Sequence, residues 1–157
     1  MLDHEAGKKT PLLIKLAPDW EEKALQRSIA RIKTFPLDGV IATNTTVSRD
    51  GLTSPLARES GGLSGKPLLK PSNKVIKTLY REIGAHIPII GVGGIFTAED
   101  AYAKIKAGAS AVQVYTGMVY QGPGMVRELK KGLVRLLRQD DLPNISAAIG
   151  LDEKTAV

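Results

Sequence analysis

A lysine inside an apolar run is the most distinctive candidate for chemistry in this chain. Lys15 lies in the run Leu12–Ala17, in which every other residue is apolar. An ammonium group in such a run is costly unless it contacts an anion or opens into a cavity. The alternative is a flexible stem that reaches solvent near the end of a strand. We favour a functional role and predict that Lys15 points inward and supplies positive charge to a ligand.

Glycines and short polar residues follow the three other apolar runs, which are Gly39–Thr43, Pro88–Gly91 and Ala111–Tyr115. The clusters after them are Asn44-Thr45-Thr46, Gly93-Gly94 and Thr116-Gly117. In parallel α/β proteins, chemistry gathers at the C-terminal ends of strands. Glycine lets backbone N–H groups approach a phosphate closely, so glycine-bearing turns after two neighbouring strands predict a phosphate-bearing ligand. Asn44 and Thr45 are placed to hydrogen-bond a planar polar substrate, although their types also suit an ordinary turn.

Apolar runs alternate with amphipathic segments along the chain, which predicts the order β-α-β-α-β-α-β-α with parallel strands and right-handed crossovers. The first strand is expected to be buried on both faces. Asp19 would cap the first helix, and Thr97 with Asp100 would form a capping box for the third. A long loop to about Pro67 follows the second strand, as expected of a functional or mobile segment. Strands are predicted at 12–17, 39–43, 88–92 and 111–115, and helices at about 20–33, 71–84, 97–107 and 124–138.

Four strand–helix units in 157 residues correspond to half of a TIM (β/α)8 barrel, because a complete barrel needs roughly 200 residues or more. The predicted fold class is therefore α/β, with residues 1–157 as a single partial domain. Four parallel strands leave two open edges and an exposed apolar face. We expect such a chain to dimerise, to aggregate or to need a partner segment.

Composition excludes several functions. The 22 basic and 16 acidic residues give a net charge of +6, spread over helix faces, and no nucleic-acid-binding motif accompanies it. The chain has no cysteine, which excludes disulfides and thiolate metal sites, and no paired carboxylates, Ser–His–Asp set or metal-ligand spacing stands out. No run approaches the roughly 20 apolar residues of a membrane span, and Met1–Glu5 is not a signal peptide.

These residues resemble the C-terminal half of a class 2, quinone-dependent dihydroorotate dehydrogenase, from about Pro11 to Gly150. Two segments carry the resemblance most specifically, Thr43-Asn44-Thr45-Thr46 and Gly61-Gly62-Leu63-Ser64-Gly65-Lys66-Pro67-Leu68. The glycine-pair element recurs in many flavin and phosphate barrels and is less specific. Three further segments carry it: 14–19, 88–95 and 108–116.

The resemblance implies FMN-dependent oxidation of dihydroorotate to orotate in pyrimidine synthesis, with a quinone as the electron acceptor. It implies that Lys15 lies near the flavin N1/O2 edge and stabilises the reduced, anionic ring. Asn44 and Thr45 would bind the pyrimidine of orotate. Thr43 and Ser64 would line the FMN site. The ribityl phosphate would be held, largely through backbone N–H groups, by Gly65, Gly93, Gly94, Tyr115 and Thr116.

The same resemblance implies what this chain would lack. The catalytic base of the class is a serine in the first half of the barrel, so no catalytic residue is expected here. The quinone site is expected mostly in the missing N-terminal part, and Met1 looks like an internal methionine where a fragment or truncated gene model begins. We expect an inactive fragment of an enzyme associated with the mitochondrial inner membrane if the source is eukaryotic, which we favour, or with the bacterial plasma membrane otherwise.

Two other functions fit the same residues. The first is another FMN- or phosphate-binding TIM-barrel enzyme, which would have no affinity for orotate. The second is a non-catalytic half-barrel that acts as an interaction module and forms a stable dimer.

Overall fold

The computed structural model describes residues 10–84 and 86–154, which form a four-stranded parallel sheet with helices packed on it. The N-terminal residues that were predicted not to form a signal peptide lie outside the described ranges. The strand order is β1-β2-β3-β4, so each strand pairs with the next in sequence, as expected for consecutive βα units. All four predicted strands are confirmed, with bounds a residue or two shorter. They are β1 Leu13–Leu16, β2 Gly39–Ala42, β3 Ile89–Val92 and β4 Ala111–Gln113.

The four predicted helices are also confirmed. They are α1 Glu22–Ile32, α2 Leu69–Ile83, α3 Ala98–Lys106 and α5 Met125–Gln139. Five shorter helical segments were not predicted, because each is too short to show a helical period in the sequence. These are two 3₁₀ turns, η1 Pro55–Arg58 and η2 Lys66–Leu68, and the short helices α4 Thr116–Gln121, α6 Ile145–Ala148 and α7 Leu151–Lys154.

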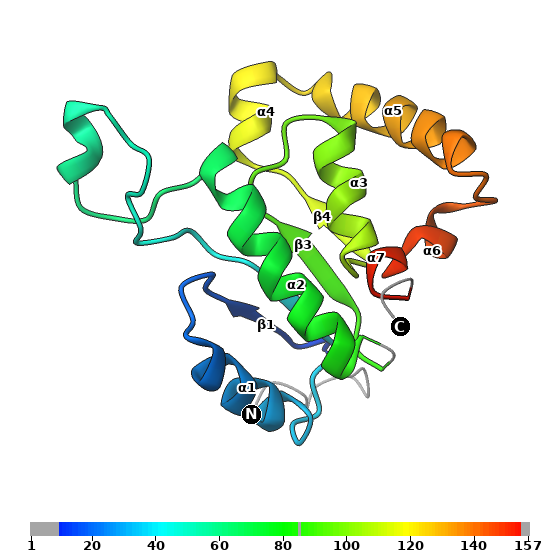
Figure 1. Cartoon of the computed structure of the whole chain (residues 1–157), viewed down its shortest axis with the longest axis horizontal. Coiled ribbons are helices and arrows are strands. Elements are labelled where there is room, and N and C mark those ends of the chain that lie inside the picture. The colour runs from blue at the N-terminus through cyan, green and yellow to red at the C-terminus, as the bar shows by residue number, and fades with distance from the viewer. Residues whose placement is uncertain (1–9, 85, 155–157) are drawn as a thin grey trace.

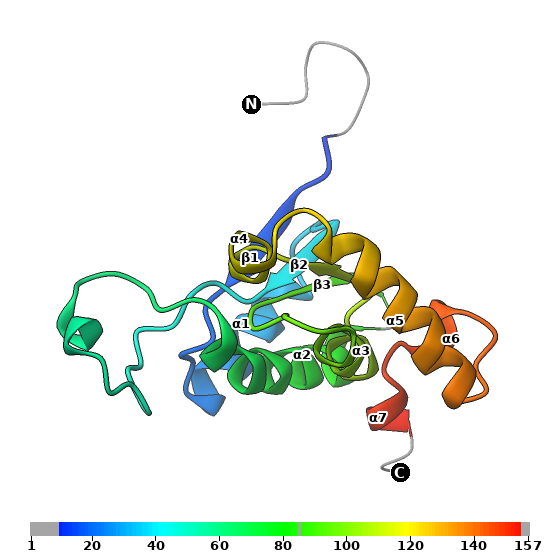
Figure 2. The ribbon, with the colours of Figure 1, turned by 90° about the horizontal axis from the view of Figure 1, so that it is seen from above.

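Helices α1, α2 and α3 lie on one face of the sheet (Figures 1 and 2). Their apolar faces meet the sheet in the main core, where Ile29, Ile76 and Leu79 pack with Val40 and Ile89, all at most 1% exposed. Burial of such side chains contributes roughly 1.5–3 kcal/mol each relative to exposure. This one-sided core fixes the direction of the strands and so brings their C-terminal ends to one edge of the sheet.

Strand β1 differs from the prediction that it is buried on both faces. Leu13 and Ile14 are 37% and 38% exposed, and among the described residues only β2 pairs with β1. The prediction was wrong because β1 is an edge strand, and its apolar residues lack a neighbour that would cover them. The open edges predicted for a partial barrel are therefore present on β1 in the described part of the chain.

Of the two predicted helix caps, one is present in the structure and one is not. The capping box is confirmed, since the Thr97 hydroxyl accepts the Asp100 N–H at 3.2 Å and the Asp100 carboxylate accepts the Thr97 N–H at 3.0 Å. The predicted Asp19 cap is wrong, because α1 begins after Glu21 and has no side-chain cap. The Asp19 carboxylate instead accepts hydrogen bonds from the Thr46 hydroxyl and from the Val47 N–H. It thus holds the start of the loop after β2.

The long loop after β2 projects from the body of the molecule (Figures 1 and 2). Its two ends are joined by an antiparallel bridge between Thr46 and Leu63. The Arg49 guanidinium donates to the carbonyl oxygens of Gly61 at 2.6 Å and Glu59 at 3.3 Å across the base of the loop. The loop therefore returns to the sheet beside the point where it leaves, which places residues 44–46 and 63–65 together.

Candidate functional site

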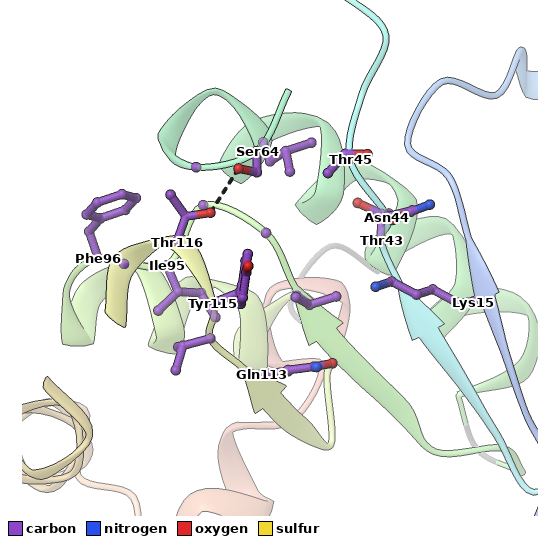
Figure 3. A pocket seen from close by; sticks show the side chains of 17 residues that line it. Lys15, Thr43, Asn44, Thr45, Ser64, Ile95, Phe96, Gln113, Tyr115 and Thr116 are labelled. Carbon is purple, nitrogen blue, oxygen red and sulfur yellow. Dashed lines mark hydrogen bonds between the residues drawn. The ribbon is translucent and has the colours of Figure 1, made fainter. Parts of the chain in front are cut away.

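A cleft of about 340 Å³ lies at the C-terminal ends of the strands (Figure 3). All ten residues predicted to form a site line this one cleft, although they come from β1, from the segments that directly follow β2, β3 and β4, and from the long loop. Because the parallel strands end at the same edge, residues far apart in sequence meet there. The ten are Lys15, Thr43, Asn44, Thr45, Ser64, Gly65, Gly93, Gly94, Tyr115 and Thr116.

Lys15 lies in β1 opposite Ile41 of β2, and its amine points into the cleft (Figure 3). The inward direction agrees with the prediction, but Lys15 is exposed rather than buried. The reason is the open edge of β1, which leaves the strand accessible to solvent. In this chain Lys15 therefore needs no internal anion, and its charge is free to contact a ligand in the cleft.

Thr43 provides the clearest sign of an absent partner. Its residue is 2% exposed, and its Oγ1 has no hydrogen-bond partner. Its backbone N–H donates to the Val92 carbonyl at 3.0 Å, which fixes the end of β2 against the end of β3. A buried hydroxyl without a partner costs roughly 1–3 kcal/mol, and such groups call for an explanation. Since Thr43 lines the cleft, a polar ligand bound there would explain the unpartnered hydroxyl directly.

The Gly93-Gly94 turn follows β3 and closes one end of the cleft. Both residues have left-handed backbone, with φ of 109° and 78°. A Cβ on Gly94 would lie 2.4 Å from the Leu69 nitrogen, so the turn packs directly against the first residue of α2. Only glycine fits this position. The wall of the cleft is therefore formed here by backbone atoms and not by a side chain.

The loop and the end of β4 meet on the other side of the cleft. The Thr116 hydroxyl donates to Ser64 Oγ at 2.9 Å (Figure 3). Thr116-Gly117 was predicted as a glycine turn, and that prediction is wrong, because both residues begin α4. Gly117 is buried, and a Cβ there would lie 2.3 Å from the Ile95 carbonyl oxygen. The glycine therefore allows α4 to pack closely rather than to turn the chain.

Several residues at or near the site were not predicted from the sequence. Gln113 points into the cleft from β4, and Phe96 lines it after the glycine turn (Figure 3). Gln113 had a readable signal, since it is a polar residue inside an apolar strand, as Lys15 is. Lys104 was also missed and is completely buried beneath the site. Its position three residues after Ala101 on an apolar helix face was the signal.

No group of three or more His, Cys, Asp or Glu side chains in residues 10–84 and 86–154 is arranged to hold a metal ion. No helix there is long and apolar enough to cross a membrane.

The fold and the cleft define a set of βα units of a parallel α/β barrel whose polar site lies at the C-terminal ends of the strands. A family model described as dihydroorotate dehydrogenase matches residues 3–137, and the chain belongs to that family. It is 48% identical over 162 residues to the dihydroorotate dehydrogenase (quinone) of Trichodesmium erythraeum (strain IMS101), covering 98% of this chain and 43% of the relative. The corresponding protein of Anaeromyxobacter sp. (strain Fw109-5) is 49% identical over 147 residues, covering 93% and 40%.

Solved structures agree with this assignment. The structure of DHODH in complex with ferulenol from Eimeria tenella superimposes with a TM-score of 0.88 at 42% identity. The match covers 94% of this chain and 39% of that one. The predicted partial α/β barrel is thereby confirmed, and the chain spans only about two fifths of the length of the relatives it matches.

Proposed function

We propose that this chain forms the FMN- and substrate-contacting part of a quinone-dependent dihydroorotate dehydrogenase, which oxidises dihydroorotate to orotate in pyrimidine synthesis. One observation carries the proposal: a single cleft gathers Lys15, the unpartnered Thr43 hydroxyl and the Gly93-Gly94 turn. Family membership and the names of the relatives support it over a different barrel enzyme.

The residues present fit FMN. Thr43 offers a buried hydroxyl that lacks a partner, and Gly93-Gly94 offers a turn without side chains, which suits a phosphate. When bound, FMN would supply the acceptor for the hydride of dihydroorotate. Thr43 and Ser64 would line the flavin, and Lys15 would offset negative charge on its ring. The phosphate would be held by Gly65, Gly93, Gly94, Tyr115 and Thr116.

Substrate would lie at the end of the cleft formed by Asn44 and Thr45. Asn44 is exposed and Thr45 is half-buried, so both are accessible from the cleft. An amide and a hydroxyl provide the donors and acceptors that a pyrimidine edge requires. We propose that they orient the ring, whereas the base that takes its proton belongs to a part of the barrel outside this chain. The chain would therefore bind FMN and the substrate without turning the substrate over. We propose that residues 1–157 form one partial domain.

We also propose that the enzyme passes its electrons to a quinone and associates with a membrane. The relatives named above are quinone enzymes, which supports a quinone as the acceptor. Most of its site is proposed to lie outside this chain, together with any contact with a membrane. Association with the mitochondrial inner membrane and with the bacterial plasma membrane both remain proposals, since the named relatives are bacterial and the named structure is from Eimeria tenella.

Flavin titration of the chain tests the proposed function. FMN is expected to bind, to raise the melting temperature and to resist bleaching by dihydroorotate, because the base is absent. Lys15→Met is expected to weaken FMN binding about tenfold, since Lys15 is the one cation that the described residues contribute to the cleft lining. Fluorescence quenching of FMN measures the affinity.

The matched control is Lys23→Met, which removes the same charge from an exposed position on α1 away from the cleft lining. Its FMN affinity should equal that of the unchanged chain. Asn44→Ala should weaken orotate binding to the flavin-loaded chain and leave FMN affinity unchanged. Equal effects of the two lysine variants, or bleaching by dihydroorotate, would contradict the proposal.

Self-association of the chain is the expected consequence of its open edge. An apolar groove of about 420 Å³ lies beside β1 and α1, where the edge strand is uncovered. We propose that further barrel segments cover it in the complete enzyme and that a second copy covers it in the isolated chain. Its apolar lining consists of Ile14, Leu16, Trp20, Ile32, Phe35 and Leu37.

Sedimentation velocity over a range of concentrations measures this association. Phe35 is 63% exposed, so Phe35→Glu should shift the chain toward monomer without disturbing the core. Val134→Glu, which adds the same charge at a 48% exposed site on α5, serves as the control and should leave the association unchanged. A chain that is monomeric at every concentration would overturn the proposal.

A further inference from the structure

Lys104 of α3 is a lysine buried within the protein. Its residue is 0% exposed, and it is the largest of the fully buried side chains in the described part of the chain. Its amine donates to Ser72 Oγ at 2.9 Å and to Asn73 Oδ1 at 2.7 Å, both on α2. A buried amine is costly unless its donors are satisfied, and these two contacts satisfy most of its hydrogen-bonding capacity.

The hydrogen bonds continue from Lys104 to the cleft. Ser72 is also fully buried, and its hydroxyl donates to the Val92 carbonyl at 2.7 Å. That carbonyl also accepts the Thr43 N–H at 3.0 Å. Val92 is the last residue of β3 and directly precedes the Gly93-Gly94 turn. The chain of contacts from Lys104 therefore ends at Thr43 and the Gly93-Gly94 turn, the two features on which the proposed flavin site rests.

The surrounding fold is shaped around the lysine stem. A Cβ on Gly91 of β3 would lie 2.6 Å from Lys104 Cγ and Cδ, so the strand has no side chain where the stem runs. Ser72 and Asn73 of α2, which accept its hydrogen bonds, and Gly91 of β3, which lies beside its stem, are all uncharged. Burial lowers the pKa of Lys104 to about 7, and the carboxylate of Asp100 on the same helix opposes this. The amine thus acts mainly as a hydrogen-bond donor.

We propose that Lys104 is a positioning residue for the phosphate end of the cleft: through Ser72 it holds the Val92 carbonyl, and with it Thr43 and the Gly93-Gly94 turn. The inference rests on the proposed function for what the turn binds. The effect of Lys104 on the position of the turn is independent of the proposed function, because it exists in the chain without any ligand.

Amide hydrogen exchange of the ligand-free chain tests this effect directly. Lys104→Met keeps the length of the side chain and removes the donor. We expect the Thr43 amide, which donates to the Val92 carbonyl, to exchange about tenfold faster, while the core amides of β2 and α2 keep their rates. Ser72→Ala should give the same pattern, and the double variant should be no worse than the more affected single variant, because the residues act in series. Ser72→Ala also decides the question if Lys104→Met fails to fold.

Binding of FMN and of riboflavin then separates positioning from general destabilisation. Both variants should weaken FMN about tenfold and leave riboflavin, which lacks the phosphate, within about twofold. Lys106→Met is the matched control, because Lys106 lies on the same helix and contacts the Tyr102 ring and Asp152 instead.

The outcomes are distinguishable. Unchanged exchange at the Thr43 amide, or equal losses for FMN and riboflavin, overturns the role of Lys104. If the unchanged chain binds FMN no better than riboflavin, the proposed phosphate site fails, and the exchange measurement still decides whether Lys104 positions the turn.

Discussion

Gly94→Ala is expected to lower the free energy of unfolding by about 3 kcal/mol and to abolish FMN binding. The added Cβ would lie 2.4 Å from the Leu69 nitrogen and 2.5 Å from its Cα, and backbone atoms at the start of α2 have no rotamer by which to move away. Overpacking of this kind typically costs 1–3 kcal/mol. The φ of 78° adds about 1 kcal/mol for a residue with a side chain. Relief of the contact requires the turn to open, and this displaces the backbone proposed to hold the phosphate.

Gly51→Ala is the control for this variant. Gly51 has almost the same φ, 77°, but a Cβ there would meet no atom within 4 Å. It should therefore show only the conformational cost of about 1 kcal/mol and unchanged FMN affinity. Denaturant unfolding at equal protein concentration measures the difference, because association alters apparent stability. If the two alanine variants lose the same stability, the close approach of the turn to α2 is not a constraint.

Much of the fold could be predicted from local sequence. The helix over Ala98–Lys106 is marked by its capping box, and the strands are marked by short apolar runs between glycine and proline signals. The short helix α4 could not be predicted, because Thr116-Gly117 is equally compatible with a turn. What decides in favour of the helix is the contact of Gly117 with the Ile95 carbonyl, which is a tertiary feature.

Burial could be predicted less well than element type. The run Leu12–Ala17 is typical of a strand covered on both faces, and the pattern is correct for a complete barrel. Leu13 and Ile14 are exposed because the covering element is not among the described residues. An apolar run shows that a strand is suited to a buried position. The exposure of the strand, however, depends on which neighbouring elements are present.

Much of the candidate site could be predicted because strand direction brings together the residues that lie in or directly after the strands. Lys15, Asn44 and Gly94 each follow or lie near a strand end, and parallel strands place those ends at one edge. Lys104 escaped prediction for the opposite reason. Its position on the apolar face was a signal, but Lys104 and Lys106 both lie in the last turn of α3, where exposed cations are common, and the packing of α3 on α2 shows that Lys104 is inside.

Stability of the chain is expected to rise with pH between about 7 and 10, and Lys104 is the cause. An unfolded lysine keeps its proton up to its ordinary pKa of 10.5, whereas burial lowers the pKa of Lys104 in the folded chain to about 7. Between these values the unfolded state binds more protons, so the free energy of unfolding increases by up to about 1.4 kcal/mol per pH unit. Below about pH 7 both states are protonated, and this contribution is constant.

Urea unfolding between about pH 7.5 and 9.5 measures this slope and should show a gain of about 2–3 kcal/mol. Tyr102 does not interfere there, because burial raises its pKa to about 12 and an unfolded tyrosine titrates near 10.0. Lys104→Met should flatten the slope, and Lys106→Met, on the same helix but half-exposed, should retain it. A flat profile in the unchanged chain would mean that Lys104 keeps its charge when buried. The donor that holds Ser72 would then be an ammonium group, and the Val92 carbonyl would lie near a permanent positive charge next to the Gly93-Gly94 turn.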